Sequence, residues 1–283
     1  MNRHRLRLFL PICIAVLQIG VATAGTPNAN QNALQKAIEG SQRTQAYVER
    51  DRFRHPLQTL QFFGMRPSMT VVEVLPGAGW YTEILAPFLR DHGQLIEATP
   101  PISSPDPFSR KMAAKYKAKL DADPAVYGRV AMDPFEPPSY MGLGAPSSVD
   151  MIVTFRNIHD FMYANVHGHV SDAIALRFFR SAYRALRPGG ILGVVAHRAP
   201  PGMPIAESFK LGRLPQAYVV TLAERAGLHL AGTSEINANP NDPGTIPVWY
   251  LPPTLSQGQQ DLAHYKAIGE GDNMTLRFEK PGA

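Results

Sequence analysis

Two short polar segments contain residue types that could orient a substrate or move a proton. One holds Arg156, Asn157 and His159, and the other holds His197 and Arg198. Each segment follows an apolar run that predicts a buried strand. Imidazole titrates near neutral pH, so both histidines are candidate proton acceptors. Taken singly, each histidine is better explained by a structural hydrogen bond at a strand end, but the pair favours a shared site. We therefore predict catalytic roles for His159, His197, Arg156 and Asn157.

A glycine turn lies upstream of these segments. The β-branched run Thr70–Leu75 predicts a strand, and an apolar helix is expected from Trp80 to Leu89. Between them stand two glycines, Gly77 and Gly79, whose missing side chains let a ligand approach the backbone and the first amides of the helix. The alternative is a tight turn that needs glycine and binds nothing.

The elements that would position these residues alternate along the chain. Further strands are predicted at 94–98, 129–132, 150–155, 191–196, 228–236 and 274–279, and helices at 31–45, 51–63, 108–120, 171–186 and 216–226. This alternation predicts an α/β fold with a mostly parallel sheet covered on both faces. Such sheets bind ligands at the carboxyl ends of their strands, where the candidate residues fall. Residues 237–271, rich in proline, are expected to form an ordered excursion carrying Trp249 and Tyr250.

The first 24 residues have the pattern of a signal peptide. Arginines precede the apolar run Leu8–Val21, and Ala22, Thr23 and Ala24 form the small-x-small sequence that signal peptidase accepts. We expect export to the periplasm or a similar compartment, a mature chain starting at Gly25, and no stable membrane span after cleavage. Residues 25–50 are expected to form a loose leader and a helix, and residues 51–283 a single domain.

Cysteine content and charge exclude several function classes. Cys13, in the predicted signal peptide, is the only cysteine, which excludes thiol catalysis, disulfides and cysteine-ligated zinc in the mature chain. Residues 1–24 hold three arginines and no acid, so the net charge of +5 becomes +2 without them, and we predict no nucleic-acid partner. His167 and His169 could form a metal site together with His159 or Asp160. Such spacing in a loop is common by chance, so we predict no metal site.

The segment from Val72 to Pro87, VEVLPGAGWYTEILAP, resembles the first motif of class I S-adenosylmethionine-dependent methyltransferases. It is most similar to a branch of predicted methyltransferases that carry export signals. The resemblance spans most of the mature chain, including the segments 54–56, 155–160, 186–190, 193–198, 234–239 and 272–278. It implies a Rossmann-like, seven-stranded sheet with the last strand antiparallel, S-adenosylmethionine as cofactor over the glycine turn, and a small-molecule methyl acceptor.

The resemblance also implies individual cofactor contacts. Glu73 would face the amino-acid end of the cofactor, whose ammonium favours a carboxylate. Backbone contacts would come from Pro76, Gly77, Ala78 and Gly79.

Other positions carried over from the family lie further along the chain. Asp133 matches an adenine-contacting position, although a plain turn cap before Pro134 explains it equally well. Phe155 is assigned to the cofactor site. Arg54 and His55 precede a helix over the site, where they could cap the substrate or only solvate a helix end.

The sequence departs from the family pattern at three positions. Thr99 stands where an acid normally binds the ribose, with Glu97 two positions earlier, and Ala196 and Gln216 stand where the family has glutamates. One hypothesis is a weakened or repurposed member that binds ligand but turns over poorly. The alternative is that those carboxylates were only surface or cap groups. Because S-adenosylmethionine is made in the cytoplasm, the competing functions are an exported ligand-binding or envelope protein without efficient methyl transfer, and a Rossmann-like enzyme of other chemistry.

Overall fold

The computed structural model describes residues 29–161 and 172–282, so the predicted signal peptide, His167 and His169 lie outside the described residues. Seven strands form one sheet in the order β3-β2-β1-β4-β5-β7-β6. Their bounds are β1 Thr70–Val74, β2 Gln94–Thr99, β3 Ala131–Pro134, β4 Val149–Phe155, β5 Leu186–His197, β6 His229–Ser234 and β7 Asn273–Glu279. Only β7 runs antiparallel to its neighbours. The Rossmann-like fold expected from the sequence is therefore confirmed.

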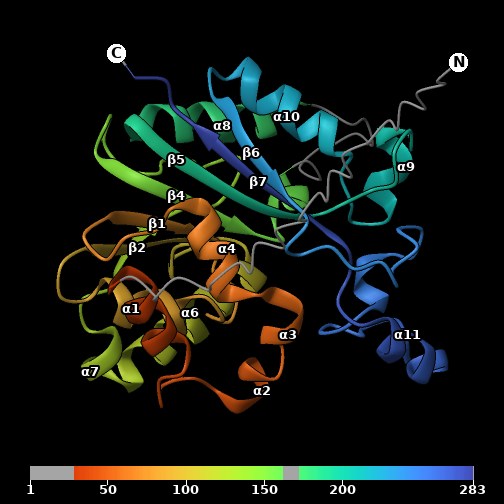
Figure 1. The fold of residues 1–283 in the computed structure, drawn as a ribbon, viewed down its shortest axis with the longest axis horizontal. Coiled ribbons are helices and arrows are strands. Elements are labelled where there is room, and N and C mark those ends of the chain that lie inside the picture. Colours follow the sequence, from red (N-terminus) through yellow and green to blue (C-terminus); the bar gives the residue numbers. More distant parts are fainter. Residues whose placement is uncertain (1–28, 162–171, 283) are drawn as a thin grey trace, which may run out of the picture.

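Helices cover both faces of the sheet (Figure 1). One face carries α8 (Asp172–Ala185) and α10 (Gln216–Arg225). The other carries α1 (Ala29–Ile38), α4 (Pro56–Phe63), α5 (Thr82–Leu89), α6 (Pro107–Ala122) and α7 (Pro124–Tyr127). The short helices α2 (Gln45–Val48) and α3 (Asp51–Arg54) connect α1 to α4, and α9 (Ile205–Lys210) and α11 (Leu262–Ile268) lie in the later loops.

Alternation along the strands divides the core into two clusters. Val72 of β1 and Ile152 of β4 join the cluster under α8 and α10, whereas Val71 and Met151 join the cluster under α1, α4 and α5. All four are fully buried. Successive strand residues point to opposite faces, so a parallel strand buried on both sides is mostly apolar, with Glu73 in β1 an exception.

The N-terminal part of the chain differs from its prediction. Residues from 29 onward are not a loose leader, because α1 packs against α4 and α5 and its Leu34 is fully buried. The helix expected over 51–63 is two helices that meet at His55, which has a left-handed φ of 40°. The break follows from Pro56, because a proline disfavours the helical conformation in the residue before it.

The proline-rich excursion at 237–271 is ordered, as predicted. The guanidinium of Arg213, fully buried, donates to the carbonyl of Ile246 at 2.9 and 3.0 Å and pairs with Asp242 at 2.8 Å. Trp249 lies close to Gly212. The φ of 67° at Gly212 is a left-handed conformation that glycine adopts without strain, and a Cβ there would lie 3.0 Å from the Trp249 ring. These contacts hold the excursion against the loop after β5.

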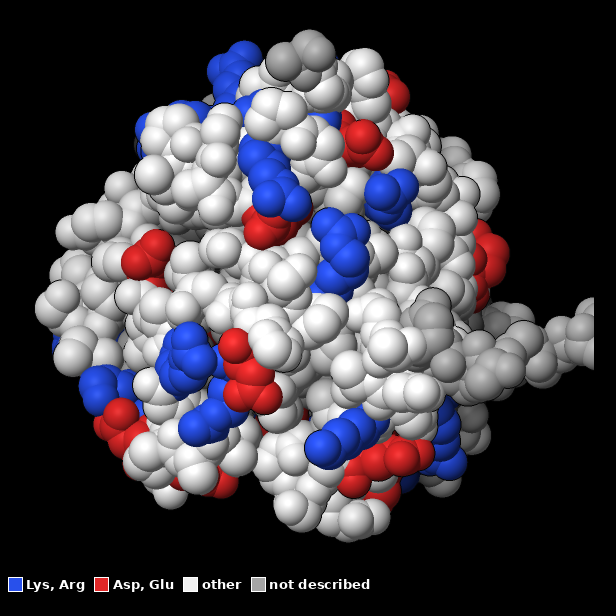
Figure 2. All heavy atoms as spheres, turned by 60° about the vertical axis from the view of Figure 1, so that its left-hand side comes forward, with Lys and Arg blue, Asp and Glu red and all other residues white. Residues whose placement is uncertain are grey.

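The described surface shows no large field of one charge on the face drawn in Figure 2, where basic and acidic side chains are interspersed. No helix among residues 29–161 and 172–282 combines the length and apolarity that a membrane crossing requires. The exclusion of a nucleic-acid partner remains a prediction.

Candidate functional site

The described part of the chain has two sizeable cavities near the carboxyl ends of the strands. The smaller, of about 470 Å³, lies beside the glycine turn and is hereafter the turn cavity. The larger, of about 910 Å³, lies beside Arg198 and is hereafter the Arg198 cavity. The larger volume does not identify the functional site, so we compare the groups that line each.

The turn cavity is walled by the glycine turn and by the ends of β2 and β4. Its lining includes Leu75, Pro76, Gly77, Ala78, Thr99, Phe155, Arg156, Asn157 and Asp160. Two of these are non-glycine residues with left-handed backbone, Leu75 at a φ of 50° and Arg156 at 63°. Strained backbone of this kind is maintained where the surrounding structure enforces it and is frequent at ligand sites.

The two glycines of the turn have different surroundings. Gly77, at a φ of 61°, has no atom within 4 Å of where a Cβ would stand, so the space beside it is open. A Cβ on Gly79, at a φ of 81°, would lie 3.1–3.3 Å from side-chain atoms of Lys119, Tyr116 and Thr82. Gly77 therefore borders the cavity, whereas Gly79 permits close packing of α5 against α6.

Asn157 fastens the turn to the sheet. Its Nδ2 donates to the carbonyls of Val74 at 2.7 Å and Leu75 at 3.2 Å, and its Oδ1 is bonded to the hydroxyl of Thr154. These bonds occupy the amide that the sequence suggested for catalysis. Although Asn157 lines the turn cavity, its contacts make it a group that positions the turn.

Two carboxyls are buried beneath the turn. Glu73 and Glu97 face each other across β1 and β2, are 2% and 0% exposed, and do not line the cavity. Glu73 accepts a hydrogen bond from Thr82 at 3.1 Å, but neither oxygen of Glu97 has a hydrogen-bond partner among the described residues. A proton on one carboxyl supplies the missing donor between them. Burial raises the pKa of Glu73 to about 7, and burial together with repulsion from an ionised Glu73 raises the pKa of Glu97 well above its usual range.

An arginine cluster forms part of the wall of the turn cavity. Arg50, Arg54 and Arg156 all line the cavity, and the single carboxylate of Glu270 lies among them. Its oxygens are 2.7 Å from Arg50 Nε, 3.0 Å from Arg54 Nε and 3.8 Å from Arg156 Nε. Glu270 is 3% exposed, so this carboxylate is a buried counter-ion for three cations.

The two predicted catalytic histidines lie close together behind the cavity. The ring centroids of His159 and His197 are 5.7 Å apart, and neither residue lines the turn cavity. Burial lowers the pKa of His159, and burial together with the neighbouring His159 and Arg156 lowers that of His197 well below its usual range. Both rings are therefore neutral at neutral pH.

Two other sequence-assigned positions also lie away from the cavity. Asp133 is on β3, paired in register with Ala98, and is not a lining residue. Ala196 is 1% exposed and belongs to the apolar cluster under α8 and α10. A glutamate at 196 would be buried in that cluster, and the effect of its absence beside His197 stays a prediction. Gln216 lines the other cavity.

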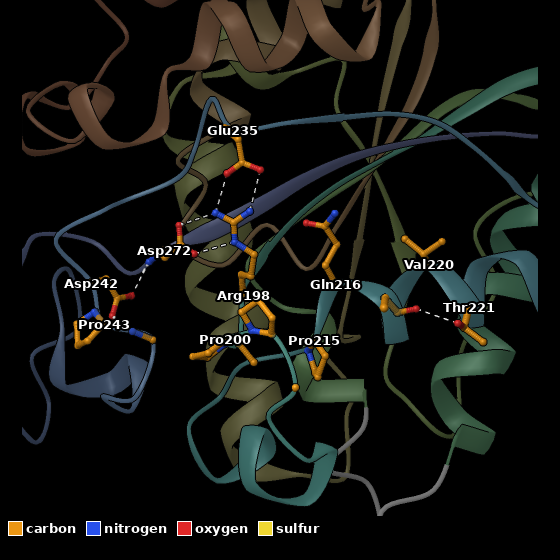
Figure 3. Close-up of a pocket in the computed structure, with 15 residues that line it drawn as sticks. Arg198, Pro200, Pro215, Gln216, Val220, Thr221, Glu235, Asp242, Pro243 and Asp272 are labelled. Atoms are coloured by element: carbon orange, nitrogen blue, oxygen red, sulfur yellow. Dashed lines mark hydrogen bonds and ion pairs between the residues drawn. The ribbon is translucent and has the colours of Figure 1, made fainter.

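Arg198 is the one arginine or lysine among the described residues that line the Arg198 cavity, and all three of its guanidinium nitrogens are hydrogen-bonded (Figure 3). Arg198 donates to Asp272 at 2.8 and 3.1 Å and to Glu235 at 2.9 and 2.7 Å. Prolines 200, 201, 215 and 243 form much of the remaining wall. Among the described residues here no buried polar side chain lacks a partner. We therefore take the turn cavity as the candidate site.

Sequence reasoning missed several residues of the turn cavity and its wall, including Phe108, Ser109, Met112 and Tyr116 of α6. Arg50 and Tyr47 come from the segment expected to be a leader and helix, and Glu270 comes from the end of the excursion. Tyr47 donates a hydrogen bond to the carbonyl of Ala78 at 3.0 Å. No local pattern indicates these residues, although the Arg54 segment within the family resemblance pointed toward this wall. No group of three or more His, Cys, Asp or Glu side chains suited to a metal ion occurs within the described ranges.

The fold resembles known methyltransferase structures. A SAM dependent methyltransferase from Aquifex aeolicus matches with a TM-score of 0.53 at 15% identity, over 89% of this chain and all of that one. The [4+2]-cyclase SpnF gives 0.53 at 15% identity over 89% and 93%, and the YcgJ protein of Bacillus subtilis gives 0.50 at 12% over 80% and 97%. No protein-family model and no curated protein sequence matches the chain.

These likenesses, at low sequence identity, concern the fold. The seven-stranded sheet, the antiparallel strand β7 and the glycine turn after β1 agree with what the sequence resemblance implied. The chain therefore has the fold of the class I S-adenosylmethionine-dependent methyltransferases.

Proposed function

We propose that this protein is an S-adenosylmethionine-dependent methyltransferase that acts on a small molecule in the turn cavity. The observation that carries the proposal is a cavity, lined by an open Gly77 and a strained Leu75, at the carboxyl ends of β1, β2 and β4 in this fold. The volume of about 470 Å³ lies within the range of small-molecule sites.

The lining fits a cofactor of this kind at the turn and less well at the ribose. Gly77 leaves space against the backbone, and Phe155 offers an apolar wall. The hydroxyl-bearing Thr99 replaces a carboxylate at the end of β2, so ribose recognition would rest on a neutral group. When bound, the cofactor supplies an electrophilic methyl group on sulfur.

The chain's own residues would align the acceptor and take up a proton where needed. Asn157 fixes the turn by its bonds to Val74 and Leu75. Asp160 lies at the cavity rim with its side chain 59% exposed, 3.4 Å from His159 Nε2. We infer that a proton leaves the acceptor through Asp160, while the neutral His159 and His197 position this rim.

Gly77→Val tests the cofactor site. A branched side chain in the open space beside the turn should weaken binding of S-adenosylhomocysteine at least about tenfold, measured by calorimetry, because the ligand and the turn backbone could no longer meet. The left-handed backbone should also cost roughly 1–2 kcal/mol of stability.

Gly64→Val is the matched control. Gly64 ends α4 at a φ of 77°, has no atom within 4 Å of where a Cβ would stand, and lies outside the turn cavity. It should lose similar stability and keep its affinity. Equal affinities of the two variants for S-adenosylhomocysteine, or no binding by the parent, would refute the cofactor site. If the parent binds but transfers no methyl group to any acceptor, the alternative of a ligand-binding protein without efficient methyl transfer is favoured.

We also propose, from the sequence of residues 1–24, that the protein is exported. The charged start, the apolar run and the Ala22-Thr23-Ala24 segment support it. N-terminal sequencing of protein from the cell envelope should begin at Gly25. Recovery of only the intact Met1 form from the cytoplasm would contradict export.

A further inference from the structure

Arg156 is held in the wall of the turn cavity by an unusual backbone. It follows β4, its φ is 63°, and its amide donates to the carbonyl of Val195 at 2.7 Å. The side chain is 7% exposed and lines the cavity. A left-handed arginine costs free energy, so the fold maintains the position against a local preference.

The guanidinium of Arg156 has unused donors. None of its three nitrogens has an acceptor in hydrogen-bond geometry among the described residues, and the hydroxyl of Tyr81 lies nearby. The nearest carboxylate oxygen, on Glu270, is 3.8 Å away and already binds Arg54. A buried, charged donor without an acceptor is costly, and a ligand oxyanion in the cavity would remove that cost.

The wall as a whole carries excess positive charge. Arg50, Arg54 and Arg156 face the buried Glu270 and the largely exposed Asp160 at the rim. Burial, and next the charge of Arg156, lower the pKa of Arg54 to about 9, which leaves it cationic at neutral pH. Burial alone would raise the pKa of Glu270, but the three arginines together hold it below its usual value.

We propose that Arg156, supported by Arg54 and Arg50, binds a carboxylate or phosphate group of the methyl acceptor. This inference rests on the proposed function. S-adenosylmethionine has an ammonium, a carboxylate and a sulfonium, so it brings a net positive charge to a wall that is already positive. An anionic acceptor balances both, and arginine's planar fork matches carboxylate and phosphate oxygens.

The test compares anions with a neutral isostere in three proteins. Benzoate and phenyl phosphate, with benzamide as the neutral probe, are titrated into the parent, Arg156→Met and Arg156→Lys, with and without S-adenosylhomocysteine. The parent should bind both anions and not benzamide. Arg156→Met should weaken anion binding about tenfold to a hundredfold, and Arg156→Lys should recover part of it.

Arg52→Met is the matched control. Arg52 lies on the same short helix as Arg54 but is exposed, with its guanidinium over Phe53 at 4.6 Å, and does not line the cavity. Arg52→Met removes the same charge as Arg156→Met, from the helix that supplies Arg54, and should leave anion binding unchanged. An equal loss in Arg52→Met would show a general charge effect and overturn the proposal.

A second arm identifies the source of the anion. If Arg156 instead holds the cofactor's own carboxylate, Arg156→Met should weaken S-adenosylhomocysteine but not methylthioadenosine, which lacks the amino-acid end. That result would overturn the acceptor assignment, as would a parent that binds neither anion. If the parent binds the anions but not S-adenosylhomocysteine, the anion site at Arg156 is supported and only the proposed methyl transfer is refuted.

Discussion

The two cavities at the strand ends differ in how the arginine that lines each of them is hydrogen-bonded. In the Arg198 cavity, Arg198 makes four hydrogen bonds to two carboxylates, and burial does not leave it short of partners. In the turn cavity, Arg156 is more deeply buried and makes none within the described residues. The first arrangement is complete without a ligand, whereas the second gains from one.

The two cavities also differ in backbone conformation and in the buried carboxyls next to them. Leu75 and Arg156 keep left-handed backbone at the turn cavity, and the Glu73 and Glu97 carboxyls are buried beneath it. No such cluster of strain and unbalanced charge borders the larger cavity in the described ranges. Volume is therefore a poorer guide to function here than unsatisfied charge.

Glu270→Gln should produce the largest effect, about 3–5 kcal/mol less stability in chemical denaturation, because it leaves three largely buried arginines without a counter-ion. Glu235→Gln is the control from the other cavity. Its side chain is 67% exposed, so it should cost no more than about 1 kcal/mol. Similar losses in the two variants would remove the distinction between the cavities.

The buried acids predict a pH dependence. The folded pair holds protons to a higher pH than the unfolded chain, so the free energy of unfolding should fall as pH rises from about 4.5 through about 7. Glu97→Gln removes one proton-binding site and lets an amide donate to Glu73. It should be about 1–3 kcal/mol more stable than the parent at pH 8 and gain little or nothing at pH 5. Parallel stability profiles from pH 5 to 8 would contradict this account.

Replacing Arg198 or Arg156 singly with methionine should give the smallest changes in stability. The two changes should differ in sign or nearly so. Arg198→Met should lose about 1–2 kcal/mol, since the largely buried Asp272 then keeps only the backbone amide of Asn239 as a donor. Arg156→Met should leave stability unchanged or raise it by up to about 1 kcal/mol, because it relieves repulsion with Arg54. Thermal unfolding of both variants measures the difference. A larger loss in Arg156→Met would mean that its charge is already compensated.

The sheet was predictable because its signals are local. Apolar runs, glycine turns and the family resemblance placed all seven strands within a few residues, apart from β5, which starts five residues earlier than expected, at Leu186. The position of Arg156 at the end of β4 followed in the same way. The break at His55 had a signal too, in Pro56, and alternation along β5 indicates that Ala196 and His197 point to opposite faces.

The rest of the candidate site depends on distant pairing. The Glu73 and Glu97 contact needs the register of β1 against β2, which no single segment encodes. Glu270 belongs to an aperiodic stretch and acquires its role only because that stretch returns to α3. The roles that the sequence assigned to His159, His197, Asn157 and Asp133 remain predictions, although the structure locates each of them.

The bond between Glu270 and α3 also affects how the protein is made. Arg50 and Arg54 precede their counter-ion by 220 and 216 positions in a chain of 283. Contacts this distant in sequence raise the contact order and are associated with slow folding. A nascent chain therefore carries Arg50 and Arg54 without this counter-ion until Glu270, 216 positions after Arg54, has been synthesised. The arginine wall of the turn cavity therefore stays without its counter-ion until the segment with Glu270 folds back onto α3.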